Sequence, residues 1–136
     1  MSTKRLLAAL LATTALAGAA YAHAPEETVQ PNFSHAIPNL PGKSLVAVEV
    51  NYPPGAASAP HRHAGSAFIY AYVVSGEIES QVDNGPARVY RAGESFYEAP
   101  GAHHGISRNA SKTQPAKLLA VFVVDTGEHP LTTPDK

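Results

Sequence analysis

The chain has 136 residues and a formal net charge of −1 at pH 7, with 44% hydrophobic and 15% charged residues, so it suits one globular domain rather than a disordered acidic chain. Its Lys and Arg residues are scattered, which argues against a nucleic-acid partner, because nucleic-acid-binding proteins cluster their basic residues in a patch. The sequence contains no cysteine, which excludes disulfides and thiolate chemistry and leaves the core, a metal or a second subunit to stabilise the fold.

Residues 1–22 are typical of a secretory signal peptide. Lys4 and Arg5 form a positive start, residues 6–17 are an apolar run, and small residues end at Ala22, where signal peptidase would cleave. An apolar run of about a dozen residues is too short for a membrane-spanning helix, which needs about 20. We therefore expect export to the periplasm or the medium, cleavage after Ala22, and no stable membrane insertion of the mature chain.

The mature chain is expected to begin with an N-terminal arm, residues 23–43. This arm contains prolines at positions 25, 31, 38 and 41. Proline lacks the backbone N–H group that a central strand donates to its neighbours, so it is confined to edge strands and irregular segments. The arm is therefore expected to be an extended segment or an edge strand.

Residues 44–125 are predicted to form the main domain, and residues 126–136 a loop-like tail. Within the domain, strands are predicted at residues 45–51, 67–74, 76–82, 87–91, 94–98 and 117–125. The third and fourth of these strands are joined by an Asp-Asn-Gly-Pro turn, which predicts a hairpin. Short strands separated by Gly and Pro turns, without helical periodicity, favour an all-β antiparallel sandwich or barrel.

The histidines of this domain have a spacing that suits a metal site. His61 and His63 are two residues apart, so on a strand both imidazoles face the same side. A third histidine from another strand could complete a metal-binding face. His103 and His104, which follow a Pro-Gly turn later in the chain, are the candidates for it.

Two spaced patterns resemble the motifs of the cupin superfamily. Residues 55–76 resemble the first motif, G-x5-H-x-H-x3–4-E-x6-G, and residues 93–104 resemble the second, G-x5-P-x-G-x2-H-x3-N. The resemblance covers approximately residues 45–124 and places the motif glycines at tight turns. It implies a small single-domain cupin, that is, a double-stranded β-helix or jelly-roll barrel with a divalent metal held inside by the motif histidines.

Carried over residue by residue, the resemblance implies that His61 and His63 are the first-motif ligands and His104 the second-motif ligand. His103 would face the opposite side of the strand. Three imidazoles suit a divalent transition metal better than calcium or magnesium. Zinc, iron, copper, nickel and manganese all remain open.

The sequence departs from the family pattern in both motifs. The first-motif glutamate has no counterpart, because Ala67, Phe68 and Ile69 occupy the positions where it could fall, and the next motif glycine comes one or two residues late. In the second motif, Arg108 stands at the place of the asparagine and Asn109 follows it. These departures leave the expected fold intact but make the metal chemistry less defined.

Two residue types are further candidates for the site. Glu98 is the nearest acidic residue that could act as a fourth ligand or a general base, although an exposed strand-end carboxylate is the interpretation we favour, because most carboxylates are exposed. Tyr70, Tyr72 and Tyr97 could face the barrel interior, where Tyr72 is a candidate catalytic residue. The alternative for all three tyrosines is core packing.

Three functions are compatible with this sequence. The first is a metal-dependent enzyme, with a dioxygenase-like oxidoreductase as the first choice, that acts on a small oxygenated molecule. The second is a non-catalytic periplasmic barrel that binds a metal or a small ligand. The third is a degenerate, metal-free cupin with an accessory role, which could form a homodimer through exposed strand edges. A fold alone does not choose among them.

Overall fold

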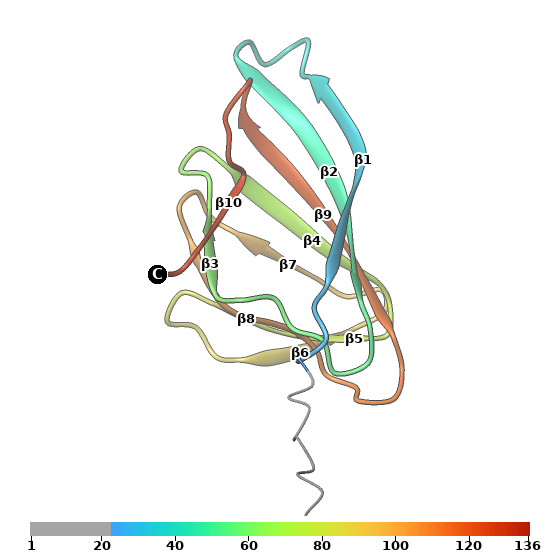
Figure 1. The fold of residues 1–136 in the computed structure, drawn as a ribbon. Helices are drawn as coiled ribbons and strands as arrows, with labels where there is room; N and C mark the ends of the chain where they lie inside the picture. The colour runs from blue at the N-terminus through green and yellow to red at the C-terminus, as the bar shows by residue number, and fades with distance from the viewer. Residues whose placement is uncertain (1–22) are drawn as a thin grey trace, which may run out of the picture.

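The structure, a computed structural model, describes residues 23–136. The expected signal peptide lies outside these residues. Throughout the described part, the regular elements are β-strands, arranged as two five-stranded antiparallel sheets (Figure 1). No helix long and apolar enough to cross a membrane is found between residues 23 and 136. The all-β jelly-roll architecture expected from the sequence is confirmed.

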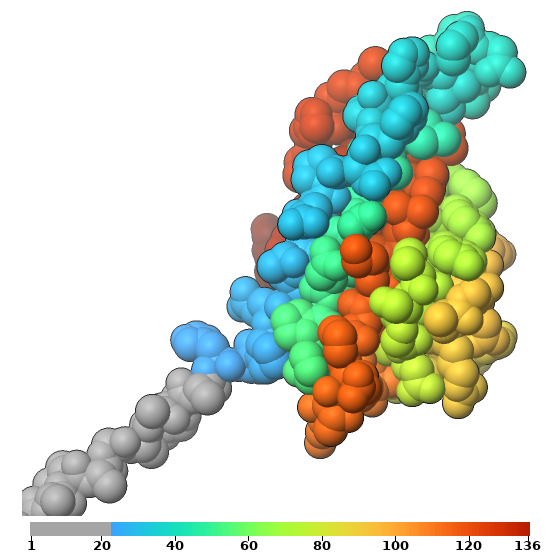
Figure 2. All heavy atoms as spheres, turned by 90° about the vertical axis from the view of Figure 1, so that its right-hand side faces the viewer, coloured from blue at the N-terminus to red at the C-terminus, as the bar shows by residue number. Residues whose placement is uncertain are grey.

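The two sheets pack face to face, and the chain passes back and forth between them. The first sheet contains, in order, β1 (Thr28–Ala36), β2 (Lys43–Tyr52), β9 (Ala116–Asp125), β4 (Phe68–Ser75) and β7 (Ser95–Glu98). The second contains, in order, β10 (Thr132–Pro134), β3 (His61–His63), β8 (His103–Asn109), β5 (Glu77–Val82) and β6 (Arg88–Arg91). Figure 2 shows the outer face of the first sheet, with its strands side by side in this order.

The core lies between the inner faces of the sheets, and β9 crosses its whole length. Alternate residues of β9, from Ala116 to Val124, are buried, because successive side chains of a strand point to opposite faces. Leu118 packs in one cluster with Tyr52 and Ile78, and Phe122 packs in a second cluster. Full burial of side chains of this size stabilises a fold by about 1.5–3 kcal/mol each.

The strand predictions are confirmed to within a few residues, but the two ends of the chain need comment. The N-terminal arm forms β1, an edge strand whose register shifts between Pro31 and Phe33. The tail, expected to be a loop, forms the short strand β10, which pairs with β3. That expectation is wrong because β10 is held by pairing with a distant strand, and its Thr-Thr-Pro sequence has no hydrophobic pattern that would reveal it.

Two β-bulges explain why the sequence departs from the spacing of the family motifs. In β4, the pairing with β9 shifts between Val73 and Ser75, so one extra residue is accommodated there. In β8, Gly105 is the extra residue, since Gln81 pairs with Ile106 while Val82 pairs with His104. Beyond each bulge, the side chains of the strand again alternate between the inner and outer faces of the sheet. The inserted residues therefore leave the barrel intact.

The bulge in β8 places Asn109 in the interior, although it stands one residue late in the motif. Its side-chain amide donates hydrogen bonds to Gln114 O at 2.7 Å and Pro53 O at 3.2 Å, and its Oδ1 accepts one from Ser111 N at 2.9 Å. Asn109 therefore ties together two loops at one end of the barrel.

Gly76 is the motif glycine whose lack of a side chain matters most. Its φ is +72°, and a Cβ at this position would lie only 2.5 Å from Pro115 O. A residue with a side chain would therefore face both an unfavourable backbone conformation and a clash. The expected tight turn at this position is confirmed.

Candidate metal centre

The three motif histidines meet inside the barrel. Strand β3 carries His61 and His63 on the same face, and His61 lies opposite His104 in the β3–β8 ladder. Nitrogen atoms of the three imidazoles all lie within 4.8 Å of one another, and His61 and His104 are buried. His103 faces the other side, where its Nε2 lies 2.7 Å from Asp135 Oδ2. The alternation of β8 thus brings His104 to the group, as the sequence predicted.

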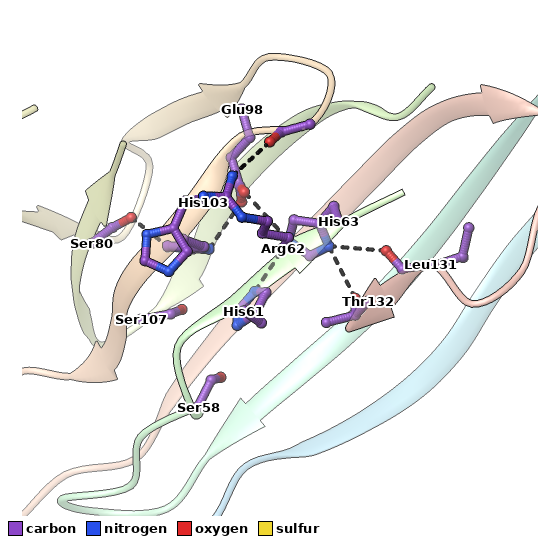
Figure 3. A network of polar contacts seen from close by, with 12 residues as sticks. Ser58, His61, Arg62, His63, Ser80, Glu98, His103, Ser107, Leu131 and Thr132 are labelled. Atoms are coloured by element: carbon purple, nitrogen blue, oxygen red, sulfur yellow. Dashed lines mark hydrogen bonds and ion pairs between the residues drawn. The ribbon is translucent and has the colours of Figure 1, made fainter. Parts of the chain in front are cut away.

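The hydrogen bonds of His61 and His63 place a hydrogen on the Nδ1 atom of both rings. His61 Nδ1 lies 2.7 Å from Ala59 O. His63 Nδ1 lies 3.2 Å from Leu131 O and 3.0 Å from Thr132 Oγ1 (Figure 3). A carbonyl oxygen can only accept, so each Nδ1 carries the hydrogen and each neutral ring keeps a lone pair on Nε2. This is the tautomer in which a histidine binds a metal through Nε2.

The two Nε2 atoms face each other at a distance of 3.2 Å. Two lone pairs at this distance repel each other unless a proton or a cation lies between them. Two nitrogens bound to one ion at about 2.1 Å would lie about 3.0–3.4 Å apart for octahedral or tetrahedral angles. The spacing of His61 and His63 therefore fits a shared metal ion.

Glu98 joins the histidines from β7. Its Oε1 lies 3.1 Å from His104 Nδ1, and its Oε2 lies 3.3 Å from His63 Nε2. Oε2 is buried and has no hydrogen-bond partner among the residues that the structure describes. A buried acceptor without a partner costs free energy, and here it faces a second acceptor, the Nε2 of His63. A cation bound by Glu98 and the histidines would satisfy these atoms together.

The charge states of the group suit a metal as well. Burial raises the pKa of Glu98, but in acid, where His104 and His63 are protonated, hydrogen bonds and attraction from these two rings outweigh burial and lower this pKa to about 2. Burial lowers the pKa of His61, and its histidine neighbours lower it further, against the opposing effect of the Ala59 carbonyl. At neutral pH the carboxylate is ionised and His61 is neutral, as metal ligands must be.

The favoured sequence interpretation of Glu98, an exposed strand-end carboxylate, is wrong, because Glu98 is only 3% exposed. Its position explains this. Glu98 pairs across the β4–β7 ladder with Ile69, one of the positions where the missing first-motif glutamate could fall. A carboxylate on the neighbouring strand thus reaches the interior in place of the one that the motif lacks. The alternation of β7, in which Tyr97 is exposed, was the sequence signal for an inward Glu98.

The expectation that Tyr70, Tyr72 and Tyr97 face the interior is wrong. Tyr70 and Tyr97 are 44% and 65% exposed. Tyr72 alternates with the buried residues Ala71 and Val73, so it lies on the outer face of the first sheet, away from the histidines. Strand β4 turns its small and branched residues inward because its inner face packs against the core, which leaves the tyrosines outside.

Several supporting residues were missed by the sequence interpretation. Ser80 Oγ lies 2.8 Å from His104 Nε2 and is buried in β5. Leu131 and Thr132 hold His63 through the pairing of β10 with β3, in which Thr132 lies opposite His63. The short C-terminal strand is therefore part of the site. No motif marks these residues, since their role arises from strand pairing alone.

A cavity of about 160 Å³ adjoins the histidines. Its apolar walls include Val48, Val50, Ala71, Leu118, Ala120 and Phe122. Its polar lining includes the hydroxyl groups of Tyr52, Ser58 and Ser107 and the carboxylates of Glu27 and Glu98. Lys and Arg are absent from its lining between residues 23 and 136. Tyr52 was not predicted here, although it continues the valine alternation of its strand.

Comparison with known proteins identifies the architecture. A family model described as "Cupin domain" matches residues 48–122. An uncharacterised conserved protein with a double-stranded β-helix domain from Klebsiella pneumoniae is 21% identical, with a TM-score of 0.63 over 82% of this chain and 86% of that one. An RmlC-like cupin family protein from Methanocaldococcus jannaschii is 13% identical, with a TM-score of 0.58 over 75% and 84% of the two chains.

An oxalate oxidase solved in complex with glycolate is similar as well. It is 22% identical, with a TM-score of 0.61, and the match covers 81% of this chain but only 55% of the oxidase. At this level of identity the similarity concerns the fold. No significant match is found among curated protein sequences.

Proposed function

Because the chain belongs to the cupin family, we propose that its interior holds one divalent transition-metal ion to which a small oxygenated molecule binds. The proposed ligands are His61, His63, His104 and Glu98. One observation carries the proposal: Glu98 Oε2 is buried without a hydrogen-bond partner among the described residues and faces an imidazole nitrogen that carries a lone pair. A metal ion is the partner that suits both atoms.

The donor set is three neutral imidazoles and one carboxylate. Such nitrogen and oxygen donors suit zinc, iron, nickel, copper or manganese. When bound, the ion would act as a Lewis acid on a substrate oxygen or, if it is redox-active, would support oxygen chemistry. An ion that takes five or six ligands would keep positions for a substrate, and the adjoining cavity provides the space.

The surrounding residues prepare this site before an ion arrives. Ala59, Leu131 and Thr132 hold His61 and His63 through Nδ1, which leaves Nε2 available. Ser80 orients the ring of His104. We assign Glu98 to the ion rather than to a general base, because both of its oxygens face imidazoles within 3.3 Å and are enclosed from solvent. Enzymatic turnover, with an oxygenase-like reaction as the first candidate, is the form of this function that we favour.

The proposed function is tested by titrating metal-free, untagged protein with Co(II), whose visible absorption reports its coordination. We expect one equivalent to bind and the Glu98→Gln variant to bind at least tenfold more weakly, because it loses a charged ligand. Glu77→Gln is the matched control, since this carboxylate is 44% exposed and pairs with Arg91 outside the site. Equal affinity of the two variants would remove Glu98 from the site, and no Co(II) binding by the unmodified chain would overturn the proposed function.

Two further proposals concern the chain outside its site. Export with cleavage after Ala22 predicts that the mature protein begins at His23, which N-terminal sequencing of protein from the periplasm or medium would test. A homodimer, expected from the exposed strand edges, would be tested by light scattering on the purified mature chain. A protein that keeps residues 1–22, or that is monomeric, would contradict the respective proposal.

A further inference from the structure

A second polar group lies in the cavity beside the histidines. Tyr52 is 2% exposed, and its hydroxyl lies 2.8 Å from both Ser58 Oγ and Ser107 Oγ. We call Tyr52, Ser58 and Ser107 the hydroxyl cluster. In Figure 3, Ser58 and Ser107 lie close to His61, and both serines line the cavity. A ligand held at the histidines would therefore lie in the same cavity as these hydroxyl groups.

The hydroxyl cluster has one more hydrogen than it can use internally. Three hydroxyl groups carry three hydrogens, whereas the two contacts within the cluster consume at most two of them. Neither serine hydroxyl makes another hydrogen bond to a residue in the described part of the chain. One O–H of the cluster, which belongs to a serine when Tyr52 donates to the other serine, is therefore available to donate to an acceptor in the cavity, such as a carbonyl or ether oxygen.

The charges around the cavity disfavour an anionic ligand. Glu98 and Glu27 both line it, and its lining within residues 23–136 offers no Lys or Arg. The charge of a divalent ion would be balanced by these two carboxylates. An added anion would then leave a net negative charge in a largely apolar cavity, which is unfavourable without a cationic partner. An uncharged ligand would leave the site neutral.

We propose, on the basis of the metal site above, that this cavity takes a small uncharged molecule with two oxygen acceptors. One oxygen binds the ion, and the other accepts the free hydrogen of the hydroxyl cluster. The short carbon skeleton between them packs against the apolar walls formed by β2 and β9. The volume of the cavity, about 160 Å³, suits a small ligand.

The test compares two probes of almost the same shape, hydroxyacetone and glycolate, which differ by a methyl group in place of a charged oxygen. Binding to the Co(II)-loaded protein is followed by the change in visible absorption. We expect hydroxyacetone to bind about tenfold more tightly than glycolate, and Glu27→Gln to narrow this preference by improving glycolate binding. Equal or tighter binding of glycolate by the unmodified protein would overturn the proposal.

The hydroxyl cluster is tested with the double variant Ser58→Ala/Ser107→Ala. It is expected to bind one Co(II) as before but to bind hydroxyacetone about five- to tenfold more weakly, as befits the loss of one hydrogen bond. Ser95→Ala is the control, because Ser95 is exposed on β7 and does not line this cavity. Unchanged hydroxyacetone affinity in the double variant would overturn the role of the cluster while leaving the metal site standing. Absence of Co(II) binding in the unmodified protein would overturn both proposals.

Discussion

The two halves of the candidate site are held in different ways. His61 and His104 lie opposite each other on neighbouring strands, so the β3–β8 ladder fixes their separation. His63 and Glu98 depend on strands that come from elsewhere in the chain: β10 holds the ring of His63, and the pairing of β7 with β4 turns Glu98 inward. The β3–β8 ladder therefore sets the positions of His61 and His104. The pairing of β10 and β7 with other strands sets the orientation of the His63 ring and of the Glu98 carboxylate.

The largest effect on metal affinity is expected from replacing His61 or His104, the two ligands that lie opposite each other in the β3–β8 ladder. In His61→Ala or His104→Ala, metal affinity should fall at least a hundredfold while the barrel stays folded, because each change removes a ligand that lines the cavity and belongs to neither hydrophobic core cluster. Metal content after dialysis and circular dichroism measure the two properties. His103→Ala is the matched control, since this neighbour faces away from the site. Full metal content in His61→Ala or His104→Ala would contradict the assignment of that histidine as a metal ligand.

This comparison also shows what the sequence could predict. The three histidines were predictable because their spacing combines with strand alternation, and the turn at Gly76 was predictable because its backbone demands glycine. The alternation of β7 indicated which face Glu98 lies on, but its burial was misjudged because it also depends on the pairing of β7 with β4, which no local pattern encodes. The role of Thr132 was missed for the same reason. The sequence predicted the positions of most strands but not which strands pair with each other.

The next effect concerns Glu98 and pH. Its pKa in the folded protein, about 2, lies below its ordinary value of 4.5, so its ionised form stabilises the fold. That contribution, on the order of 3 kcal/mol, is fully present above about pH 4.5 and is lost as the pH falls through about 2. We expect urea unfolding of the metal-free protein to show this acid-induced loss, and Glu98→Gln to show much less of it.

This expectation would be contradicted if the free energy of unfolding of the unmodified protein and of Glu98→Gln changed in the same way between pH 5 and pH 2. It would mean that the carboxylate is not stabilised by His63 and His104 in the folded state. Glu77→Gln again serves as the control, because that exposed side chain should leave the pH dependence of the unmodified protein in place.

A smaller effect is expected from the support that β10 gives to His63. Removal of residues 129–136 deletes the strand that bonds to His63 Nδ1 and should weaken metal binding by about 10–100-fold, the usual effect of losing the partner of a ligand histidine. Thr132→Val, which removes only one of the two acceptors, should have a lesser effect. Calorimetric titration with Zn(II) measures both, and an unchanged affinity in the truncated chain would show that the ladder alone positions His63.

The smallest effect is expected at Ser80. Ser80→Ala removes the hydroxyl 2.8 Å from His104 Nε2, but the β3–β8 ladder still holds the ring near its place. We expect metal affinity to fall only a few-fold, as for the loss of one hydrogen bond. A loss as large as that of His104→Ala, in the same calorimetric titration, would contradict the view that the ladder dominates this half of the site.

The central claim, that these histidines and Glu98 hold a metal ion in the cell, is tested most directly by elemental analysis. Untagged protein is purified from its native source beside the His63→Ala variant, and its metals are counted by mass spectrometry. We predict close to one equivalent of a single transition metal in the unmodified protein and its loss in the variant. The same low metal content in both would contradict the claim and indicate a metal-free barrel.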